Sequence, residues 1–185
     1  LWSNSGYKVA VIDADPQKSL TYWLSERKKY YGADDIGINF YNFDIRNLTE
    51  EVKKIKRKYD FIIIDSPPAI TFETLQIIKA SNGVFVPVQP SPLDLMATLP
   101  FLQIARDERK KPLIILNRVM PRAKLTEAMI LRLRYSGAKI ARSRISSKVI
   151  FAESFAVGRG VVDINVTSDA AKEIINVGNE ILRNL

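Results

Sequence analysis

The feature that most constrains this 185-residue chain is the stretch from Tyr59 to Pro68, Tyr-Asp-Phe-Ile-Ile-Ile-Asp-Ser-Pro-Pro. Its apolar run, Phe61 to Ile64, is rich in β-branched residues and lacks polar alternation, which is typical of a strand covered on both faces in a parallel sheet. The run ends on Asp65, and the prolines that follow stop the strand. Ligands of open α/β sheets bind just beyond the carboxyl ends of the strands, so Asp65 is expected at a functional edge.

A second strand is expected to deliver carboxylates to the same edge. Lys8 to Ile12 is another strand of the buried type, and Asp13-Ala14-Asp15-Pro16-Gln17 follows it. Four apolar residues followed by Asp, as at Asp65, are the pattern of a Walker B strand, whose carboxylate holds Mg²⁺ directly or through water. Two alternatives stay open: many strand-end acids only cap the next helix, and Asp15 could be a plain N-cap for a helix that begins near Pro16.

Composition limits the chemistry that is available. The chain has neither cysteine nor histidine, which excludes disulfides, thiolate or histidine-dependent nucleophiles, and zinc sites built from these residues. Lys and Arg number 28 against 20 acids, for a net charge of +8, and this favours a polyanionic partner. No apolar run approaches the roughly 20 residues that span a bilayer, and no signal-peptide pattern opens the chain. We therefore expect a cytoplasmic protein.

The chain alternates between expected strands and helices, which indicates an α/β fold with a doubly wound, mostly parallel sheet in a single domain over residues 1–185. Residues 1–6 are expected to be the last turn of a helix, closed by Gly6. Strands are expected at 8–12, 38–43, 61–64, 83–88 and 111–117, and helices at 17–31, 47–58, 71–80, 93–109, 124–135 and 168–185. Residues 139–167 are expected to be irregular, with short strands at most.

Three stretches, Gly6 to Gln17, Tyr59 to Asp65 and Val86 to Asp94, resemble in their order and spacing the ParA/MinD family of deviant-Walker ATPases. The chain is most similar to the small ParA-type (ParF-like) DNA partition proteins. The resemblance implies a P-loop NTPase-like fold, ATP and Mg²⁺ as cofactors, and a role in plasmid or chromosome partition. It also implies an ATP-dependent homodimer that binds nonspecific DNA at the nucleoid and acts with a centromere-binding ParB-type partner.

One departure from the family pattern affects the expected activity. The family opens with a strand and a Gly-rich P-loop, but this sequence has no G-x-x-x-x-G-K-[ST] motif, and its start resembles only the end of the helix after that loop. The resemblance thus implies a form truncated before its first strand and P-loop, with an unpaired edge on the Phe61 to Ile64 strand. Such a chain is expected to bind nucleotide poorly. The alternative function is a P-loop-less, non-hydrolysing scaffold or interaction module.

The resemblance also implies roles for individual residues. Asp65 would be the Walker B carboxylate and, with Asp13, a residue of the metal site, while Asp15 would orient the attacking water. Candidate nucleotide-binding residues are Pro16, Gln17 and Asn117, the last at the position that hydrogen-bonds adenine. Candidate dimer-interface residues are Pro90, Ser91, Pro92 and Asp94. Two alternatives remain: Asn117 as a turn residue that closes its strand, and 90–94 as a strand-to-helix connector.

Basic residues gather late in the chain, and the resemblance implies that they contact DNA. The candidates are Arg142, Arg144, Lys148 and Arg159. The first three lie in the region expected to be a loop with little acid nearby. The alternatives are an ordinary solvated face and membrane binding as in MinD. MinD relies on an amphipathic targeting helix beyond the domain, whereas residues 170–185 fit a helix packed on the sheet, so DNA is favoured over membrane.

Overall fold

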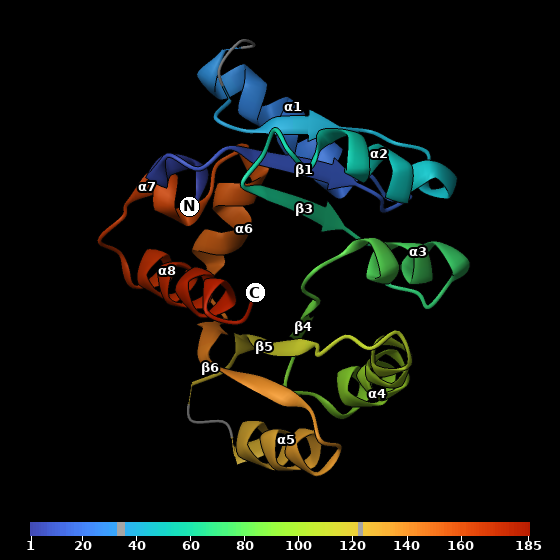
Figure 1. The fold of residues 1–185 in the computed structure, drawn as a ribbon. Coiled ribbons are helices and arrows are strands. Elements are labelled where there is room, and N and C mark those ends of the chain that lie inside the picture. The colour runs from blue at the N-terminus through green and yellow to red at the C-terminus, as the bar shows by residue number, and fades with distance from the viewer. Residues whose placement is uncertain (33–35, 122–123) are drawn as a thin grey trace. The chain divides into compact units, whose positions relative to one another are not determined.

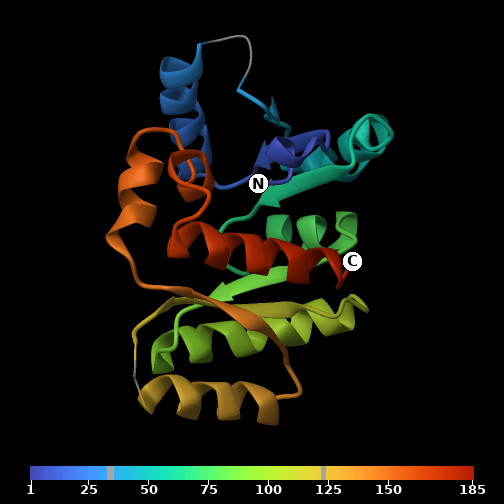
Figure 2. The same cartoon turned by 90° about the vertical axis from the view of Figure 1, so that its left-hand side faces the viewer.

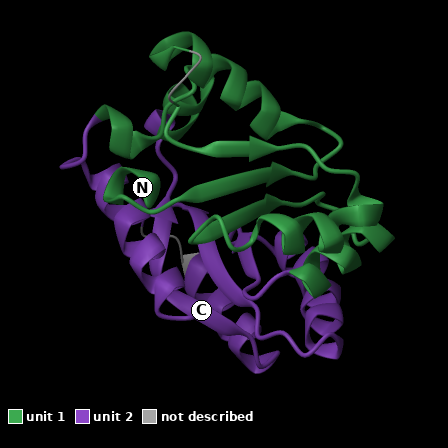
Figure 3. Ribbon diagram, turned by 45° about the horizontal axis from the view of Figure 1, so that its top comes forward, with its two compact units in different colours: residues 1–80, 151–164 green, residues 81–150, 165–185 purple. Residues whose placement is uncertain are grey.

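The computed structural model describes residues 1–32, 36–121 and 124–185 (Figure 1). The chain divides into two compact units, residues 1–80 with 151–164 (unit 1) and residues 81–150 with 165–185 (unit 2) (Figure 3). Each unit contains a three-stranded sheet in which all pairings are parallel. The predicted α/β class with parallel sheets is therefore confirmed. Residues 33–35, between the helix expected at 17–31 and the strand expected at 38–43, lie outside the described residues.

Unit 1 is built around a central strand, β1, with strand order β2-β1-β3. Its elements are η1 (Ser3–Ser5), β1 (Val9–Asp13), α1 (Ser19–Tyr31), β2 (Asn39–Tyr41), η2 (Ile45–Asn47), α2 (Leu48–Ile55), β3 (Phe61–Asp65), α3 (Phe72–Ala80) and α7 (Val161–Ile164), with α6 (Val149–Ala156) starting at the unit boundary. Every residue of β1 is buried, as expected for a strand with neighbours on both sides. The core on one face joins Ile12, Leu48 and Ile77.

Strand β3 of unit 1 differs in one respect from the sequence-based expectation. Strand β3 was expected to be covered on both faces, but Ile63 is 42% exposed. Within the described residues β3 pairs with β1 alone, so one edge of the strand is open. At its start, Phe61 stacks on Trp2 with ring centroids 4.7 Å apart. Gly6, with φ of 88°, closes η1 as predicted.

Helix α1 is fixed at its far end by a buried arginine. Arg27 donates hydrogen bonds to the carbonyls of Ile36 (2.8 Å) and Gly158 (3.2 Å) and forms an ion pair with Asp163 at 2.8 Å. Burial raises the pKa of Asp163, but its hydrogen bonds, including that from Arg27, outweigh this effect and hold the pKa below its usual value. The network joins α1 to α7 although the two helices are far apart in the sequence.

Unit 2 has strand order β4-β5-β6, with β5 at the centre. Its elements are β4 (Phe85–Val88), α4 (Pro92–Asp107), β5 (Leu113–Val119), α5 (Lys124–Tyr135), β6 (Lys139–Ser146) and α8 (Asp169–Leu182). Helices α4 and α5 cover one face of the sheet and α8 covers the other (Figure 2). Pro87 lacks an N–H donor but is tolerated because β4 lies at the edge of its sheet.

The expectation that residues 139–167 are irregular is wrong. They contain the eight-residue strand β6 and the helices α6 and α7. Strand β6 carries five polar or charged side chains and therefore lacks the apolar run that identified the other strands. Its stability comes from partners distant in sequence, β5 and α8. No helix in the described ranges is both long and apolar enough to cross a bilayer.

Candidate functional site

Two strands of unit 1 end side by side with a carboxylate each. Asp13 of β1 and Asp65 of β3 are direct partners in the parallel register, and the amide of Ala14 donates to the carbonyl of Asp65 at 2.9 Å. Residues paired in this way lie on the same face of a sheet. Asp15 lies two residues beyond the end of β1, and its charge acts on Asp65. The structure thus gathers the three predicted carboxylates at the carboxyl edge of this sheet.

Asp13 is fully engaged in holding the start of α1. It is 1% exposed, and one carboxylate oxygen accepts a hydrogen bond from the amide of Asp15 at 3.2 Å. The other oxygen accepts from the amide of Thr21, at 2.9 Å, and from its hydroxyl. Amides in the first turn of a helix have no partner within the helix, so Asp13 caps α1 from the end of β1. Sequence reasoning missed this role because the two residues are eight positions apart.

Asp15 does not cap α1, so that alternative reading is wrong. Its carboxylate accepts from the amide of Gln17 at 2.9 Å and forms a local turn, while the N-cap position of α1 is Lys18, which makes no side-chain cap bond. Lys18 has a left-handed backbone, with φ of 55°, and its Nζ donates to the carbonyl of Asp13 at 3.2 Å. Pro16 and Gln17 are exposed beside Asp15. The Asp15 side chain is thus only partly buried and keeps access to solvent.

Asp65 has the electrostatics of a cation ligand. Burial raises its pKa above the ordinary value, and the negative charges of Asp13 and Asp15 raise it further. A half-buried carboxylate destabilised by like charges gains stability when a cation approaches. Carboxylate oxygens suit Mg²⁺, which keeps several waters and takes one or two protein carboxylates. Among the described residues, however, no three acidic side chains form a group that could hold a metal.

The nucleotide and dimer candidates of unit 2 make local hydrogen bonds. The side-chain oxygen of Asn117 accepts from the amide of Arg118 at 2.9 Å. Asp94 accepts from the amide of Gln89 (2.9 Å) and from the Ser91 hydroxyl (3.2 Å), and Ser91 accepts from the amide of Asp94 at 3.1 Å. This reciprocal pattern is that of a helix cap at the start of α4. Ser91 and Asp94 therefore have a structural role, while Pro92 is exposed and Pro90 partly buried.

The four DNA candidates are less free than the sequence indicated. Arg144 forms an ion pair with Glu127 at 3.1 Å, and Lys148 forms one with Glu173. Arg159 lies over the ring of Tyr30, 4.7 Å from its centroid, and donates to the carbonyl of Asp163. The expectation of little acid near the cluster is wrong, because α5 and α8 bring carboxylates to it. Of the four candidates, Arg142 and Arg159 have no ion pair within the described residues, and Arg159 is held by Tyr30 and the carbonyl of Asp163, so the Arg142 guanidinium is the least engaged.

Two glutamates of α8 that sequence reasoning missed protect the free edge of β6. Glu180 accepts from the amides of Arg142 and Ser143, both at 2.8 Å, and Glu173 accepts from the amide of Ser146 at 2.9 Å. Burial raises the pKa of each glutamate, but the hydrogen bonds outweigh it and keep both pKa values below the ordinary value. Their seven-residue spacing, two helical turns, puts both on one face of α8.

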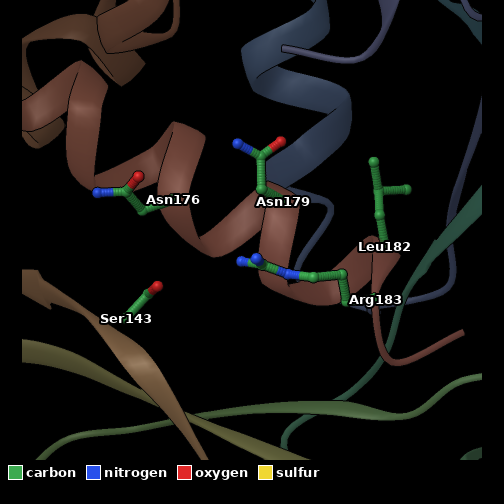
Figure 4. A pocket seen from close by; sticks show the side chains of 5 residues that line it. All are labelled: Ser143, Asn176, Asn179, Leu182 and Arg183. Carbon is green, nitrogen blue, oxygen red and sulfur yellow. The ribbon is translucent and has the colours of Figure 1, made fainter.

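A cavity of about 520 Å³ in unit 2 is lined by one residue of β6 and by residues of the second half of α8 and just beyond it (Figure 4). Its lining residues are Ser143, Asn176, Asn179, Leu182 and Arg183. None of them was a sequence candidate. None of the described carboxylates of the β1–β3 edge lines it either, so this cavity and the candidate site are separate features.

Comparisons with known proteins agree with this fold. A family model described as an AAA domain matches residues 34–115. Maintenance of carboxysome distribution protein A of Halothiobacillus neapolitanus is 26% identical over 182 residues, which cover 95% of this chain and 83% of that protein. Two other relatives, one of them a ParA family protein of Mycoplasma genitalium, are matched over 52% and 59% of their own length.

Solved structures share the fold. The cell division ATPase MinD of Pyrococcus furiosus superposes with a TM-score of 0.80 at 19% identity, covering 99% of this chain and 89% of MinD. MinD of Pyrococcus horikoshii, solved with Mg-ADP, gives a TM-score of 0.74 at 20% identity and covers 97% of this chain and 85% of that one. The fold is that of the P-loop NTPases. Within that class, the matches confirm the similarity to the ParA/MinD family of ATPases that the sequence motifs indicated.

Proposed function

We propose that this protein is a ParA-type ATPase that partitions DNA, plasmid or chromosomal, with ATP and Mg²⁺ as cofactors. The observation that carries the proposal is the carboxylate edge of unit 1, where Asp65 is half-buried and its pKa is raised by burial and by Asp13 and Asp15. Asp13 and Asp15 accept local hydrogen bonds, but a fold that needed these strands only for packing would gain nothing from a half-buried Asp65 whose ionised form they destabilise.

Each carboxylate has a distinct part in the proposal. Asp65 would hold Mg²⁺, directly or through a water, and the ion when bound would neutralise charge on the phosphates. Asp15, which keeps access to solvent, would orient the attacking water. Asp13 has a structural part: it accepts hydrogen bonds from Thr21 and from the amide of Asp15, and these fix the segment that carries Asp15. No strong base is needed, because phosphoryl transfer depends mostly on positioning and electrostatics.

No motif in the 185 residues supplies the phosphate-binding part of the proposal. The sequence has no P-loop motif, and a nucleotide's phosphates require such a cradle of amides and a lysine. We therefore propose that the ATPase activity belongs to a form of the protein that carries a P-loop. Within the described residues β3 pairs with β1 alone, and its other edge would accept a further parallel strand.

Dimerisation and DNA binding complete the proposal. Leu93 and Met96, 78% and 69% exposed on the first turns of α4 beside Pro92, supply the apolar surface that a homodimer contact at 90–94 needs. Arg142 is the cation best placed to contact a phosphate. The proposed setting is the cytoplasm at the nucleoid, and the proposed partners are nonspecific DNA and a ParB-type centromere-binding protein.

A second candidate function is a non-hydrolysing scaffold of the same fold. It is favoured by Asp13, whose two oxygens are both taken by hydrogen bonds within the chain. A scaffold would keep this cap and would have no use for Asp15, so Asp15 separates the two candidates.

The experiment compares Asp15→Ala with wild type in a form that carries a P-loop. The ATPase proposal predicts that ATP binding is retained while turnover falls by roughly 10² or more, the loss expected for a water-orienting group. Asp107→Ala, at the exposed end of α4, is the matched control and should leave turnover unchanged. Calorimetry on the 185-residue chain should give no micromolar binding of Mg·ATP. Equal turnover in Asp15→Ala and wild type would contradict the proposed role.

The DNA part has a separate test, a salt titration of random-sequence duplex. Each phosphate contact contributes about 0.9 to the slope of log affinity against log salt. Arg142→Ala should lower the slope by about 0.9. Because Arg144 and Lys148 are ion-paired within the chain, the triple variant with alanine at 142, 144 and 148 should lower it little further. If the slope of the triple variant falls by the equivalent of three phosphate contacts, DNA displaces both ion pairs. An unchanged slope in both variants would place DNA binding elsewhere.

A further inference from the structure

The solvent side of α5 has an arrangement that an ordinary exposed helix lacks. The helix packs on the β4-β5-β6 sheet through Met129, Ile130 and Leu133, all at most 5% exposed. Solvated helices place charged residues opposite such a stripe. Here the opposite side carries Leu131, 52% exposed, and Tyr135, 82% exposed. The centre of the exposed face is therefore apolar.

The exposed apolar residues form a line along the helix. Ala128, Leu131 and Tyr135 are spaced by three and then four residues, so they lie above one another on one side of α5. We call these three residues the α5 ridge. The spacing is that of the a and d positions of a heptad, the pattern with which one helix packs against another.

Two arginines flank the α5 ridge on opposite sides. At about 100° per residue, Arg132 follows Leu131 on one flank and Arg134 precedes Tyr135 on the other. Both are exposed, and in the described part of the chain neither guanidinium has an ion pair or hydrogen bond. They occupy the e and g positions of the same heptad, from which charged side chains form interhelical salt bridges. The acid on this side, Glu127, is already paired with Arg144 at 3.1 Å.

We propose that the α5 ridge is a docking surface for an acidic amphipathic helix of a partner protein. An apolar stripe on that helix would cover Leu131 and Tyr135, and carboxylates beside the stripe would pair with Arg132 and Arg134. Tyrosine and arginine are the residue types most enriched at protein contact sites. The proposal is independent of the ATPase proposal, since α5 holds none of the candidate site residues.

The other occupants fit the ridge less well. A second copy of the chain would set arginine flanks against arginine flanks, which like charges oppose. A DNA backbone needs cations at the centre of the contact, and here the centre is apolar. A membrane surface requires a much longer apolar face than three side chains. The helix partner alone uses both the apolar centre and the two charged flanks.

The test uses the 185-residue chain and a fluorescent synthetic peptide of three heptads with Leu at a and d and Glu at e and g. We expect the wild-type chain to bind it with a Kd of about 10–100 µM. Binding should weaken at least about tenfold in R132E/R134E and in L131A/Y135A, and it should fall with added salt. Lys111→Glu with Lys139→Glu, an equal charge change at exposed positions outside α5, is the matched control and should leave the Kd unchanged. Y135F, which keeps the aromatic ring, should bind nearly as wild type.

The control peptides and ligands decide between occupants. A peptide with Lys at e and g should bind R132E/R134E better than wild type, because the charge pairing is reversed. Random-sequence duplex and vesicles containing anionic phosphatidylglycerol are tested with the same variants. The proposal is overturned if wild type fails to bind the acidic peptide at about 1 mM. It is also overturned if R132E/R134E keeps peptide affinity but loses affinity for duplex or for vesicles. Circular dichroism on each variant verifies that its fold is retained.

Discussion

The substitution Asp65→Asn should stabilise the protein at neutral pH. Asp65 is paired in register with Asp13 on an adjacent strand, and adjacent strands lie about 4.8 Å apart. Two unit charges at about 5 Å repel by roughly 3 kcal/mol at an effective dielectric constant of 20. Because Asp65 is only half-buried, water screens part of this repulsion. We expect a gain of about 1 kcal/mol in the free energy of unfolding, within the range that single stabilising changes reach.

The pH dependence of this gain follows from the direction of the pKa shift. The pKa of Asp65 is raised in the folded state by burial and by the charges of Asp13 and Asp15. Ionised Asp65 therefore destabilises the fold at high pH, and the penalty disappears as pH falls through the raised pKa and the carboxylate takes up a proton. The asparagine variant has no such group. Its advantage over wild type should be largest at pH 7 and above and should vanish in acid.

The assay is thermal unfolding from pH 4 to pH 8. A gain of about 1 kcal/mol corresponds to a Tm increase of roughly 2–4 °C in a chain of this size. Glu153→Gln, an exposed change on α6, is the matched control and should give no pH-dependent difference. A lower Tm of Asp65→Asn at pH 7, or an advantage that grows in acid, would refute the reasoning. Either result would mean that the ionised carboxylate is stabilised by its surroundings and not strained by them.

Two further substitutions each test a contact within one unit. Gly158→Ala should cost roughly 3 kcal/mol in urea unfolding, because the residue has φ of +66° and a Cβ would lie 2.0 Å from the backbone nitrogen of Arg27. Glu180→Gln should cost about 1–2 kcal/mol, since it weakens charge-assisted hydrogen bonds to two β6 amides. Hydrogen exchange at the amide of Arg142 should then become faster, while Glu153→Gln, which touches neither amide, should leave it unchanged.

Much of the fold could be predicted because most strands carry their own signal. Strands β1, β3 and β5 each begin with a continuous apolar run of four residues, and each lies within two residues of its expected position. Strand β6 could not be found in this way. Its exposed and buried residues alternate only partly, and its amides are satisfied by Glu173 and Glu180, about 30 residues later. A local pattern holds no information about such partners.

The candidate site was predictable in place but not in detail. Two apolar strands that end on Asp must deliver these side chains to one edge of a parallel sheet, and Asp13 and Asp65 are indeed paired. Which of the acids caps α1 depends on hydrogen bonds that the sequence pattern does not specify. Asp13 is the acid that caps α1, through Thr21, and Asp15, the expected cap, turns back on the amide of Gln17. Because Lys18 has a left-handed backbone, α1 begins only at Ser19, too far along the chain for Asp15 to be its N-cap.

The partners of the charged residues also depend on the fold. An excess of cations predicts an anionic partner for the molecule but not the place where it binds. The fold determines which cations are already paired with carboxylates of the chain and which are not. The sequence placed the basic surface at 142–148, where α5 and α8 supply Glu127 and Glu173 as counter-ions. Arg132 and Arg134 have no such counter-ion within the described residues, and their positions on either side of an apolar line suit carboxylates on a protein helix better than phosphates on a nucleic acid. One excess of positive charge can therefore serve two different partners at two different surfaces.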